Sequence, residues 1–461
     1  MVEKNILLDK YEIIKEQAEK DLPVWVETSK HDLPELFKNY MYPVNAWPII
    51  ISETTANELQ TLSIKLPKLI QQIPKLYFNN DVKKIADYYF SGNEFIAQYA
   101  MISHEKKIDI GSRLDLMYTE DGFKVLEINI GSSIGGWQVQ SFEKVIRKFH
   151  PYLSNQENSN YFHSEDSQKN YVKFLIDKTL QHVKSIENEV NIFINFGQDQ
   201  HEEIDAKSLL FFNELLDVEF KKRGLTGMAC SGKLSSLKLR NGNLYLGNTK
   251  IHSVILLVSD DEEVPVDVFR SFLMDATYFP DHVGVTMYGD KRNLGLLRTL
   301  AEKSKFSEED NELILDSIPW TAEIKKRDII YKKETFDLID FLRNHKDLMV
   351  IKSARGYQGK DVFIGKYVTN EEWEEAIQIG LQETDFIAQE FSDSINFKAP
   401  NKNNEWTSHK LVWGSFGFGN MYGGVWVRMS EVESNLGVIN SATGAVEAIV
   451  YELREEDFYI I

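Results

Sequence analysis

Residues 111–129 predict a β-hairpin whose two strands are charged on one face. Residues 111–117 and 123–129 alternate polar and apolar side chains, as strands with one buried face do. Between them, Glu120-Asp121-Gly122 is typical of a three-residue turn with glycine in the left-handed conformation. The register set by this turn places Met117 and Val125 opposite each other on the polar face. The other face would consist of core residues, namely Leu114, Leu116, Leu126 and Ile128.

The polar face of this hairpin carries two pairs of opposing side chains. Arg113 lies opposite Asn129, and Asp115 lies opposite Glu127, in the predicted register. Two carboxylates directly opposite each other destabilise a sheet by up to about 1 kcal/mol, so another group has to offset their repulsion. A hard divalent cation is a natural candidate, because carboxylates and amide carbonyls are its ligands. An exposed polar face, with Arg113 paired to either carboxylate, explains the same spacing about as well.

A second group of residues has the character of a phosphate site. The apolar segment 348–352 predicts a strand that ends in Lys352, and a loop with small residues, 353–361, follows it. A lysine at a strand end supplies a point charge, and small residues let backbone N–H groups approach phosphate oxygens. Upstream, Lys291 opens a predicted helix. Downstream, another predicted strand ends in Gln389-Glu390-Phe391, whose main-chain groups could meet an adenine edge.

The order of these pieces resembles the ATP-grasp superfamily, in which two lysines hold ATP beneath a small-residue loop. Glu127-Ile-Asn129 matches the Glu-x-Asn of that family's metal hairpin, and residues 423–428 resemble its closing strand. Because the hairpin precedes both lysines, the chain is similar to the circularly permuted branch, which includes the synthetase part of glutathionylspermidine synthetase. The likeness covers roughly residues 100–150 and 285–461. It implies an α+β, ATP-grasp fold with a circularly permuted order of elements and two or three lobes.

The resemblance also implies a role for each matching residue. For ATP it implies Lys291, Lys352, Ser353, Gly356, Gln358, Gly359, Lys360, Gln389, Glu390 and Phe391. For one or two Mg²⁺ ions it implies Asp115, Glu127 and Asn129. Arg113 and Arg428 would stabilise the transferring phosphoryl group. The loop residues Ser132, Ser133 and Gly135 would hold a substrate carboxylate.

The implied activity is that of an ATP-dependent carboxylate–amine ligase. It would form an amide bond through an acyl phosphate and release ADP and phosphate. Its partners would be a small-molecule or peptide carboxylate and an amine acceptor, neither of which the sequence identifies.

Two other functions remain open at this point. The chain could be an ATP-binding regulator without turnover, although retention of Arg113 argues against this. Gly131-Ser-Ser133-Ile-Gly135 also matches the Gly-x-Ser-x-Gly motif of α/β-hydrolases, with Ser133 as nucleophile and His252 or His409 as base. The strand before that motif carries Glu127 and Asn129, whereas a hydrolase's central strand is nearly all apolar.

Composition narrows the class of protein further. A length of 461 residues suggests roughly three domains, and 43% hydrophobic residues can build a large core. The formal charge of −19 argues against nucleic acid as a general partner. The single cysteine, Cys230, excludes an intrachain disulfide and a Cys-based zinc site. With no run of 18 apolar residues and no secretory signal pattern, we expect a cytoplasmic protein without a membrane partner.

Composition shifts divide the chain into four predicted segments. Residues 1–100 are mostly helical and include a helix over 57–76 that Pro67 and Pro74 kink or divide. Residues 101–153 hold the hairpin and a following helix. Residues 154–288 form an α/β substrate domain, and residues 289–461 form the ATP-binding lobe and a closing β-rich segment.

Overall fold

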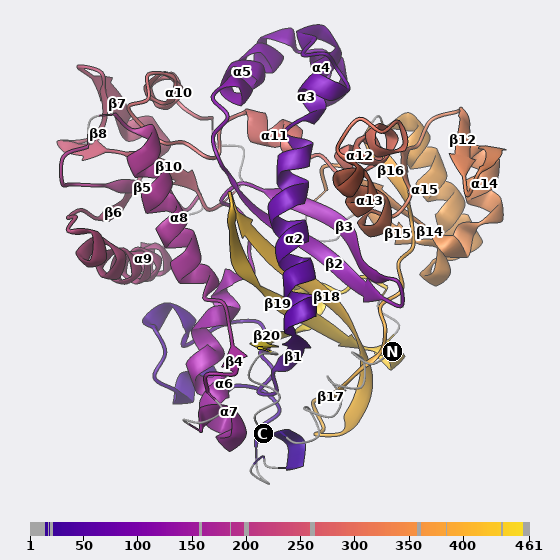
Figure 1. Ribbon diagram of the computed structural model, residues 1–461, viewed down its shortest axis with the longest axis horizontal. Helices are drawn as coiled ribbons and strands as arrows, with labels where there is room; N and C mark the ends of the chain where they lie inside the picture. Colours follow the sequence, from indigo (N-terminus) through magenta and orange to yellow (C-terminus); the bar gives the residue numbers. More distant parts are fainter. Residues whose placement is uncertain are drawn as a thin grey trace.

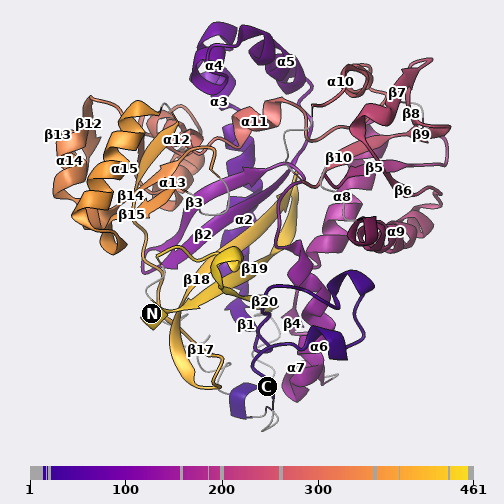
Figure 2. The same cartoon turned by 180° about the vertical axis from the view of Figure 1, so that it is seen from behind.

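A central, mostly antiparallel sheet runs through the protein and carries other units on both sides (Figures 1 and 2). In the view of Figure 1, a compact α+β lobe lies to the right of this sheet and an α/β unit lies to the left. The computed structural model describes residues 14–16, 18, 22–155, 159–184, 186–197, 202–258, 263–356, 361–383, 385–434 and 437–454.

The central sheet takes its strands from distant parts of the chain. In spatial order they are β1 (Ile49–Ser52), β20 (Val446–Leu453), β19 (Met421–Glu431), β18 (Trp406–Phe418), β2 (Gly111–Thr119) and β3 (Gly122–Ile130). Two short strands extend it, β17 (Phe397–Pro400) beside β18 and β4 (Phe162–His163) beside β20. Only β1 and β20 pair in parallel within this sheet. Strands from all four predicted segments therefore share one sheet, although the third segment contributes only the short β4.

One face of the central sheet is covered by the long helix α2 (Glu53–Ile70) (Figure 1). Ser52 begins this helix, because its hydroxyl accepts the N–H of Thr55 at 3.1 Å. Its buried residues recur every three to four positions and pack on the sheet. Helix α2 ends at Ile70, and a short helix, α3 (Ile73–Leu76), follows it. The predicted division is confirmed at Pro74, which lies at the start of α3, whereas Pro67 lies inside α2 and does not divide it.

Further helices surround this core. They are α4 (Val82–Tyr89), α5 (Glu94–Glu105), α6 (Glu143–Phe149), α7 (Pro151–Ser154) and α11 (Gly284–Tyr288). No helix in the described ranges is both long enough and apolar enough to cross a bilayer.

The β2–β3 hairpin has the predicted register in the half that carries the polar pairs. Arg113 pairs with Asn129, and Asp115 pairs with Glu127. Side chains of directly opposed residues lie on the same face. The four polar residues therefore share one face of the sheet, as the sequence predicts.

The other half of the hairpin differs from the prediction because of a β-bulge. Leu116 pairs with Val125, which leaves Leu126 as an additional residue in β3, and Thr119 pairs with Gly122. The turn is therefore one residue shorter than predicted. Val125 is fully buried in the core, whereas Leu126 is not part of that core. The predicted positions of these two side chains are exchanged because the bulge shifts the alternation by one residue.

The lobe to the right in Figure 1 is built on a second sheet. Its strands, in spatial order, are β11 (Thr321–Glu323), β16 (Phe386–Glu390), β14 (Met349–Ser353) and β15 (Val362–Ile364). Around it lie α12 (Arg292–Glu302), α13 (Glu308–Ser317), α14 (Leu338–Asn344), α15 (Asn370–Gln382) and the hairpin β12 (Asp328–Tyr331) to β13 (Glu334–Asp337). The lobe has its own apolar core beneath α14 and α15. The strands predicted at 348–352 and 386–390 are confirmed within one residue.

The unit on the opposite side contains a parallel sheet. Its strands are β10 (Ser253–Leu256), β5 (Ile192–Asn195) and β6 (Ala229–Ser231), in that order. The accompanying elements are α8 (Ser167–His182), α9 (Glu202–Arg223), α10 (Val266–Leu273) and the small sheet β7 (Leu237–Arg240), β8 (Asn243–Leu246) and β9 (Thr249–Ile251). The predicted βα unit is confirmed as β5 followed by α9.

Trp426 on β19 fixes how closely the loop after β3 approaches the central sheet. Its indole fits between two glycines: a Cβ at Gly136 would lie 2.1 Å from its Cε2, and one at Gly414 would lie 2.3 Å from its Nε1. The Arg428 guanidinium lies 5.2 Å from the centroid of the same ring. The two glycines thus make room for a ring that also supports Arg428.

We expect Gly414→Ala to lower the free energy of unfolding by about 1–3 kcal/mol, because the added methyl collides with the buried indole. Urea denaturation measures this change. Gly289→Ala is the matched control, since its Cβ would meet only an ordinary contact at 3.5 Å and its φ is −77°. Trp426→Phe should recover part of the loss in the Gly414→Ala background. Equal effects of the two glycine substitutions would contradict this packing.

Candidate functional site

The Asp115 carboxylate binds two arginines at once. Arg113 donates to both of its oxygens, from Nε at 2.8 Å and from Nη2 at 3.1 Å. Nη2 of Arg428, from β19, lies 2.9 Å from Oδ2. Burial by itself would raise the pKa of Asp115, but the charges of Arg113 and Arg428 outweigh it and hold that pKa well below its usual range. The carboxylate is therefore a permanent anion that orients both guanidinium groups.

Glu447 is a further carboxylate at this site that the sequence analysis did not identify. It pairs with Arg428 across β19 and β20. Its oxygens accept the hydroxyls of Tyr40 at 2.7 Å and Ser441 at 2.6 Å. Burial raises the pKa of Glu447. A lone carboxylate inside the otherwise apolar run Val446–Val450 is the signal that could have indicated it.

The two predicted lysines, Lys291 and Lys352, reach neighbouring residues of the hairpin from different elements. Lys352, on β14, donates to the carbonyl of Leu126 at 2.8 Å. Lys291, at the start of α12, lies 3.4 Å from Glu127 Oε2. The structure thus places both lysines beside the polar face of β2 and β3, as the order of motifs predicts.

The Lys352 ammonium is buried and hydrogen-bonded within the lobe as well. It donates to Gln389 Oε1 at 2.9 Å, and Gln389 Nε2 donates to Thr321 Oγ1 at 3.1 Å. Burial lowers the pKa of Lys352 to about 8, although the Glu127 carboxylate attracts the charge. The ammonium therefore lacks part of the anionic compensation that a buried cation needs.

Lys291 is held in place by the residues around the start of α12. Its backbone N–H donates to the Ala354 carbonyl at 3.1 Å, and its Nζ donates to the Gly356 carbonyl at 2.8 Å. Beside it, Arg292 makes a two-pronged ion pair with the buried Asp290, with Nε to Oδ1 at 2.9 Å. The sequence analysis did not predict this pair.

The residues predicted to face adenine lie at the end of β16. The N–H of Glu390 donates to the Trp320 carbonyl, and the N–H of Phe391 donates to the Leu348 carbonyl, both at 2.8 Å. An adenine at this edge would thus have to be recognised by carbonyl groups or side chains.

The predicted phosphate loop is described only at its two ends. The N–H of Ser353 donates to the Asp361 carbonyl at 3.2 Å and closes the base of the loop. Three predicted ATP ligands, Gln358, Gly359 and Lys360, lie outside the described residues.

The Gly/Ser loop after β3 is fixed between Arg113 and the α/β unit. The Gly135 carbonyl accepts Nη1 of Arg113 at 2.8 Å. The N–H of Ser132 donates to Asp281 Oδ1 at 2.7 Å, so this N–H is not free to bind a substrate carboxylate. Burial raises the pKa of Asp281 to about 6. Ser133 is exposed on the same loop.

The geometry gives no support to Ser133 as a hydrolase nucleophile. Its strand, β3, ends the path of a mostly antiparallel sheet and is not a central parallel strand. Both histidines considered as bases are engaged elsewhere. His252 Nδ1 accepts the Asn191 N–H at 3.0 Å, and His409 Nδ1 lies 3.2 Å from the Thr407 carbonyl.

The donors for a divalent cation are Glu127 and Asn129, which are neighbours on β3. Asn129 Nδ2 lies 3.1 Å from Glu127 Oε1. Asp115 belongs to the same face, but its oxygens are bound by the two arginines. Within the described ranges, no three His, Cys, Asp or Glu side chains are grouped to hold a metal ion. Glu127 and Asn129 thus offer two side chains with oxygen donors, fewer than a site built from protein ligands alone would need.

Comparison with known proteins identifies the fold. No family model and no curated protein matches the sequence. The structure is similar to that of a glutathione synthetase-like effector from Globodera pallida, with a TM-score of 0.55, 14% identity and 97% of each chain covered. D-alanyl-alanine synthetase A from Vibrio cholerae has a TM-score of 0.25 and 12% identity over 49% of this chain and 68% of its own, which is too low to bear on the fold. The chain therefore has an α+β fold like that of the glutathione synthetase-like effector.

We expect Asp115→Asn to reduce the free energy of unfolding by about 3–5 kcal/mol, because it leaves two buried guanidinium groups without their anion. Because the pKa of Asp115 is depressed in the folded protein, its contribution is complete above the unfolded pKa of about 3.9. It is lost as pH falls below that value. The difference in the free energy of unfolding between the wild type and Asp115→Asn should thus narrow below about pH 4.

Denaturation at several pH values measures this gap. Asp121→Asn, at the exposed hairpin turn, is the matched control and should stay near the wild type. A gap that is constant with pH would show that Asp115 does not hold the arginines as a charge.

Proposed function

We propose that the protein is an ATP-dependent carboxylate–amine ligase that releases ADP and phosphate. The observation that carries this proposal is the position of Lys291 and Lys352. They come from separate elements of one lobe, yet both lie against the face of β3 that presents Glu127 and Asn129. A pair of lysines beside oxygen ligands is suited to a nucleotide triphosphate with its metal.

In this proposal the two lysines hold the phosphates of ATP. Lys352 is buried and incompletely neutralised, so a phosphate oxygen would supply the negative charge it lacks. The loop 353–361, including Gly356, would cover the phosphates through its backbone N–H groups. Ser353 could contribute its hydroxyl, because its N–H donates to the Asp361 carbonyl. The adenine would lie at the end of β16, next to Gln389, Glu390 and Phe391.

Glu127 and Asn129 would hold Mg²⁺. When bound, the ion neutralises charge on the β- and γ-phosphates. We assign Asp115 mainly to the arginines, because both of its oxygens are bound by them.

Arg113 would act on the reacting groups. It is fixed by Asp115 on one side and by the Gly135 carbonyl on the other. A substrate carboxylate would lie at the Gly/Ser loop, where the N–H groups of Ser133 and Gly135 face it. Its oxygen would attack the γ-phosphorus to give an acyl phosphate and ADP, and an amine would then displace phosphate. Arg113 and Arg428 would stabilise the charge on the transferring phosphoryl group.

The order of the elements supports a permuted arrangement. The hairpin with the proposed metal ligands, β2–β3, precedes the lobe with both lysines along the chain. β18 and β19 then return to the same sheet and supply Arg428. We propose that this order is a circular permutation of the ATP-grasp elements.

Incubation with ATP, Mg²⁺, hydroxylamine and a panel of amino acids and peptides tests the activity. A ligase of this type should form hydroxamates together with ADP and orthophosphate. AMP and pyrophosphate as products would contradict the proposal. ATP binding without turnover on any substrate would favour a regulatory protein.

Glu127→Gln should retain the fold, and its Mg²⁺-dependent turnover should be at least about a hundredfold slower than that of the wild type. This corresponds to a loss of roughly 2.7 kcal/mol in transition-state stabilisation. The substitution removes one ligand charge at nearly constant volume. ADP release and melting temperature together measure the two effects. Glu383→Gln, an exposed carboxylate in the same lobe, is the control and should turn over like the wild type. Full Mg²⁺-dependent activity of Glu127→Gln would place the metal elsewhere.

ATP binding should take up a proton near pH 8. The free Lys352 is half charged there, because its pKa is about 8, and bound phosphates favour the charged form. ATP affinity should therefore fall as pH rises above 8, whereas below pH 7 this lysine is already charged. Titration calorimetry in buffers of different ionisation enthalpy measures the uptake. Lys352→Met should abolish it, and an unchanged uptake in that variant would assign the proton to another group.

A further inference from the structure

A partly buried carboxylate joins the α/β unit to the Gly/Ser loop. Asp281 lies just before α11, in a segment that runs beside β10, where the Tyr278 N–H donates to the His252 carbonyl at 2.9 Å. Its two oxygens accept one backbone N–H from each side. Oδ1 accepts that of Ser132 at 2.7 Å, and Oδ2 accepts that of Leu256 at 2.8 Å. One carboxylate therefore connects the loop with the end of β10.

The loop has a glycine at the position that this carboxylate approaches most closely. Gly131 has a φ of +109°, and a Cβ there would lie 2.9 Å from Asp281 Oδ1 and 3.3 Å from Val285 Cγ1. A side chain at position 131 would therefore displace the carboxylate that the next residue binds. The Gly131 N–H donates to the Gly111 carbonyl at 2.9 Å. Gly131 thus allows the loop to lie against Asp281 and the start of β2 at the same time.

The contact with Asp281 continues through the loop to Arg113. The Ile134 N–H donates to the Ser132 carbonyl at 2.9 Å, so the backbone of the loop is hydrogen-bonded within itself. At its far end, the Gly135 carbonyl accepts Nη1 of Arg113 at 2.8 Å. A shift of Ser132 would thus move the carbonyl that binds Arg113, together with the N–H groups that we assign to the substrate carboxylate.

The negative charge of Asp281 is held by hydrogen bonds alone. In the described part of the chain, the groups that stabilise this anion belong to Leu256 and Ser132, with no cationic side chain among them. Burial has the larger effect and raises the pKa of Asp281 to about 6. The ionised carboxylate accepts both N–H groups. When it is protonated, one oxygen becomes a hydroxyl, which also donates and is a weaker acceptor.

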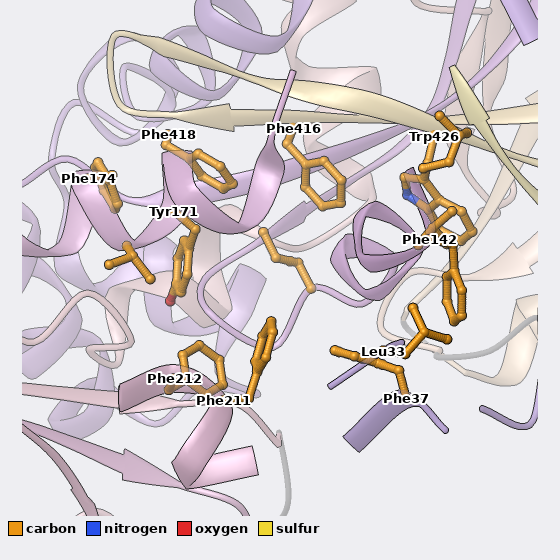
Figure 3. Packing of buried hydrophobic residues seen from close by; sticks show 14 of the residues in the cluster. Leu33, Phe37, Phe142, Tyr171, Phe174, Phe211, Phe212, Phe416, Phe418 and Trp426 are labelled. Carbon is orange, nitrogen blue, oxygen red and sulfur yellow. The ribbon is translucent and has the colours of Figure 1, made fainter. Parts of the chain in front are cut away.

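The titratable side chains around Asp281 keep one charge state near neutral pH. Those that face it within the described ranges are Tyr171, on α8, and Tyr278, and burial raises the pKa of both. The Tyr171 ring lies 5.3 Å from that of Phe418 in the aromatic cluster of Figure 3. Burial lowers the pKa of the adjacent His282 to about 3, so its ring is neutral. Asp281 is therefore the group here that changes charge between pH 5 and 7.

We propose that Asp281 is a positioning residue, which fixes the Gly/Ser loop against β10 and thereby sets the position of Arg113 for the substrate carboxylate. This rests on the proposed ligase function, because the loop and Arg113 are the groups that we assign to that carboxylate. Binding of the carboxylate should weaken as the pH falls below 6, because protonation weakens the contact with Ser132. Binding of ATP should change little over this range, since the lysines of the lobe do not contact Asp281.

The first test needs no turnover and follows three NMR signals against pH, the amides of Ser132 and Leu256 and the Nε–H of Arg113. In the wild type all three should shift with a common midpoint near pH 6. Asp281→Asn should abolish these shifts, whereas Asp217→Asn, at an exposed position of α9, should leave them unchanged. Amide signals that do not titrate, or an Arg113 signal that does not follow them, would overturn the proposal.

The second test measures the hydroxamate assay with a carboxylate that gives ADP. At pH 7.5, Asp281→Asn should raise KM for the carboxylate at least tenfold, while KM for ATP changes less than twofold. The wild-type kcat/KM for the carboxylate should fall below pH 6, and this fall should be absent in the variant. Gly131→Ala, which displaces the Asp281 carboxylate from the loop side, should raise the same KM and serves if Asp281→Asn fails to fold.

The outcomes of the two tests separate the proposal from its alternatives. A merely structural role of Asp281 would lower kcat with both KM values unchanged, and that result would overturn the proposal. If no carboxylate gives ADP, the ligase function fails, and the NMR titration still decides whether Asp281 positions the loop and Arg113.

Discussion

The hydrogen bond from the Lys352 ammonium to the Leu126 carbonyl joins the lobe to the central sheet. A buried ammonium is costly unless its donors are satisfied, so the lobe has to present Lys352 to acceptors. Leu126 is the additional residue of the β-bulge, and bulged residues are left out of regular pairing. Leu126 also lies on β3, the end strand of the central sheet, and directly precedes Glu127, which pairs with Asp115.

One face of the central sheet combines two environments. Near Asp115, the face carries buried charges that satisfy one another. Further along the same face, Phe416, Phe418 and Trp426 belong to a large apolar core. Alternation along β18 and β19 keeps these residues on one side, whereas α2 covers the other side. The face thus separates buried ion pairs from apolar packing along the same strands.

The sequence was sufficient to predict the polar pairs of the hairpin and the positions of both lysines. Those predictions rely on alternation and on the order of motifs, which are local signals. The bulge at Leu126 was not predicted, although the adjacent apolar residues Val125 and Leu126 interrupt the alternation of residues 123–129 at this point. The fit of Trp426 between Gly136 and Gly414 could not be predicted either, because these glycines contact the indole only when distant parts of the chain have come together. Whether the gathered residues bind ATP and Mg²⁺ stays a prediction.

The charge of the site is opposite to the charge of the protein. The chain as a whole carries −19, yet the site contains four cationic side chains, from Arg113, Lys291, Lys352 and Arg428. The carboxylates beside them are fewer: Asp115 and Glu127 make ion pairs with them, and Glu447 lies opposite Arg428 in the sheet. In a partly buried setting such a local excess attracts anions more strongly than it would in water. The acidic surface would repel extended polyanions, whereas a compact anion neutralised by Mg²⁺ could reach the lysines. The proposed binding of a small phosphorylated ligand is consistent with this local excess of positive charge, which the net charge of the chain does not reveal.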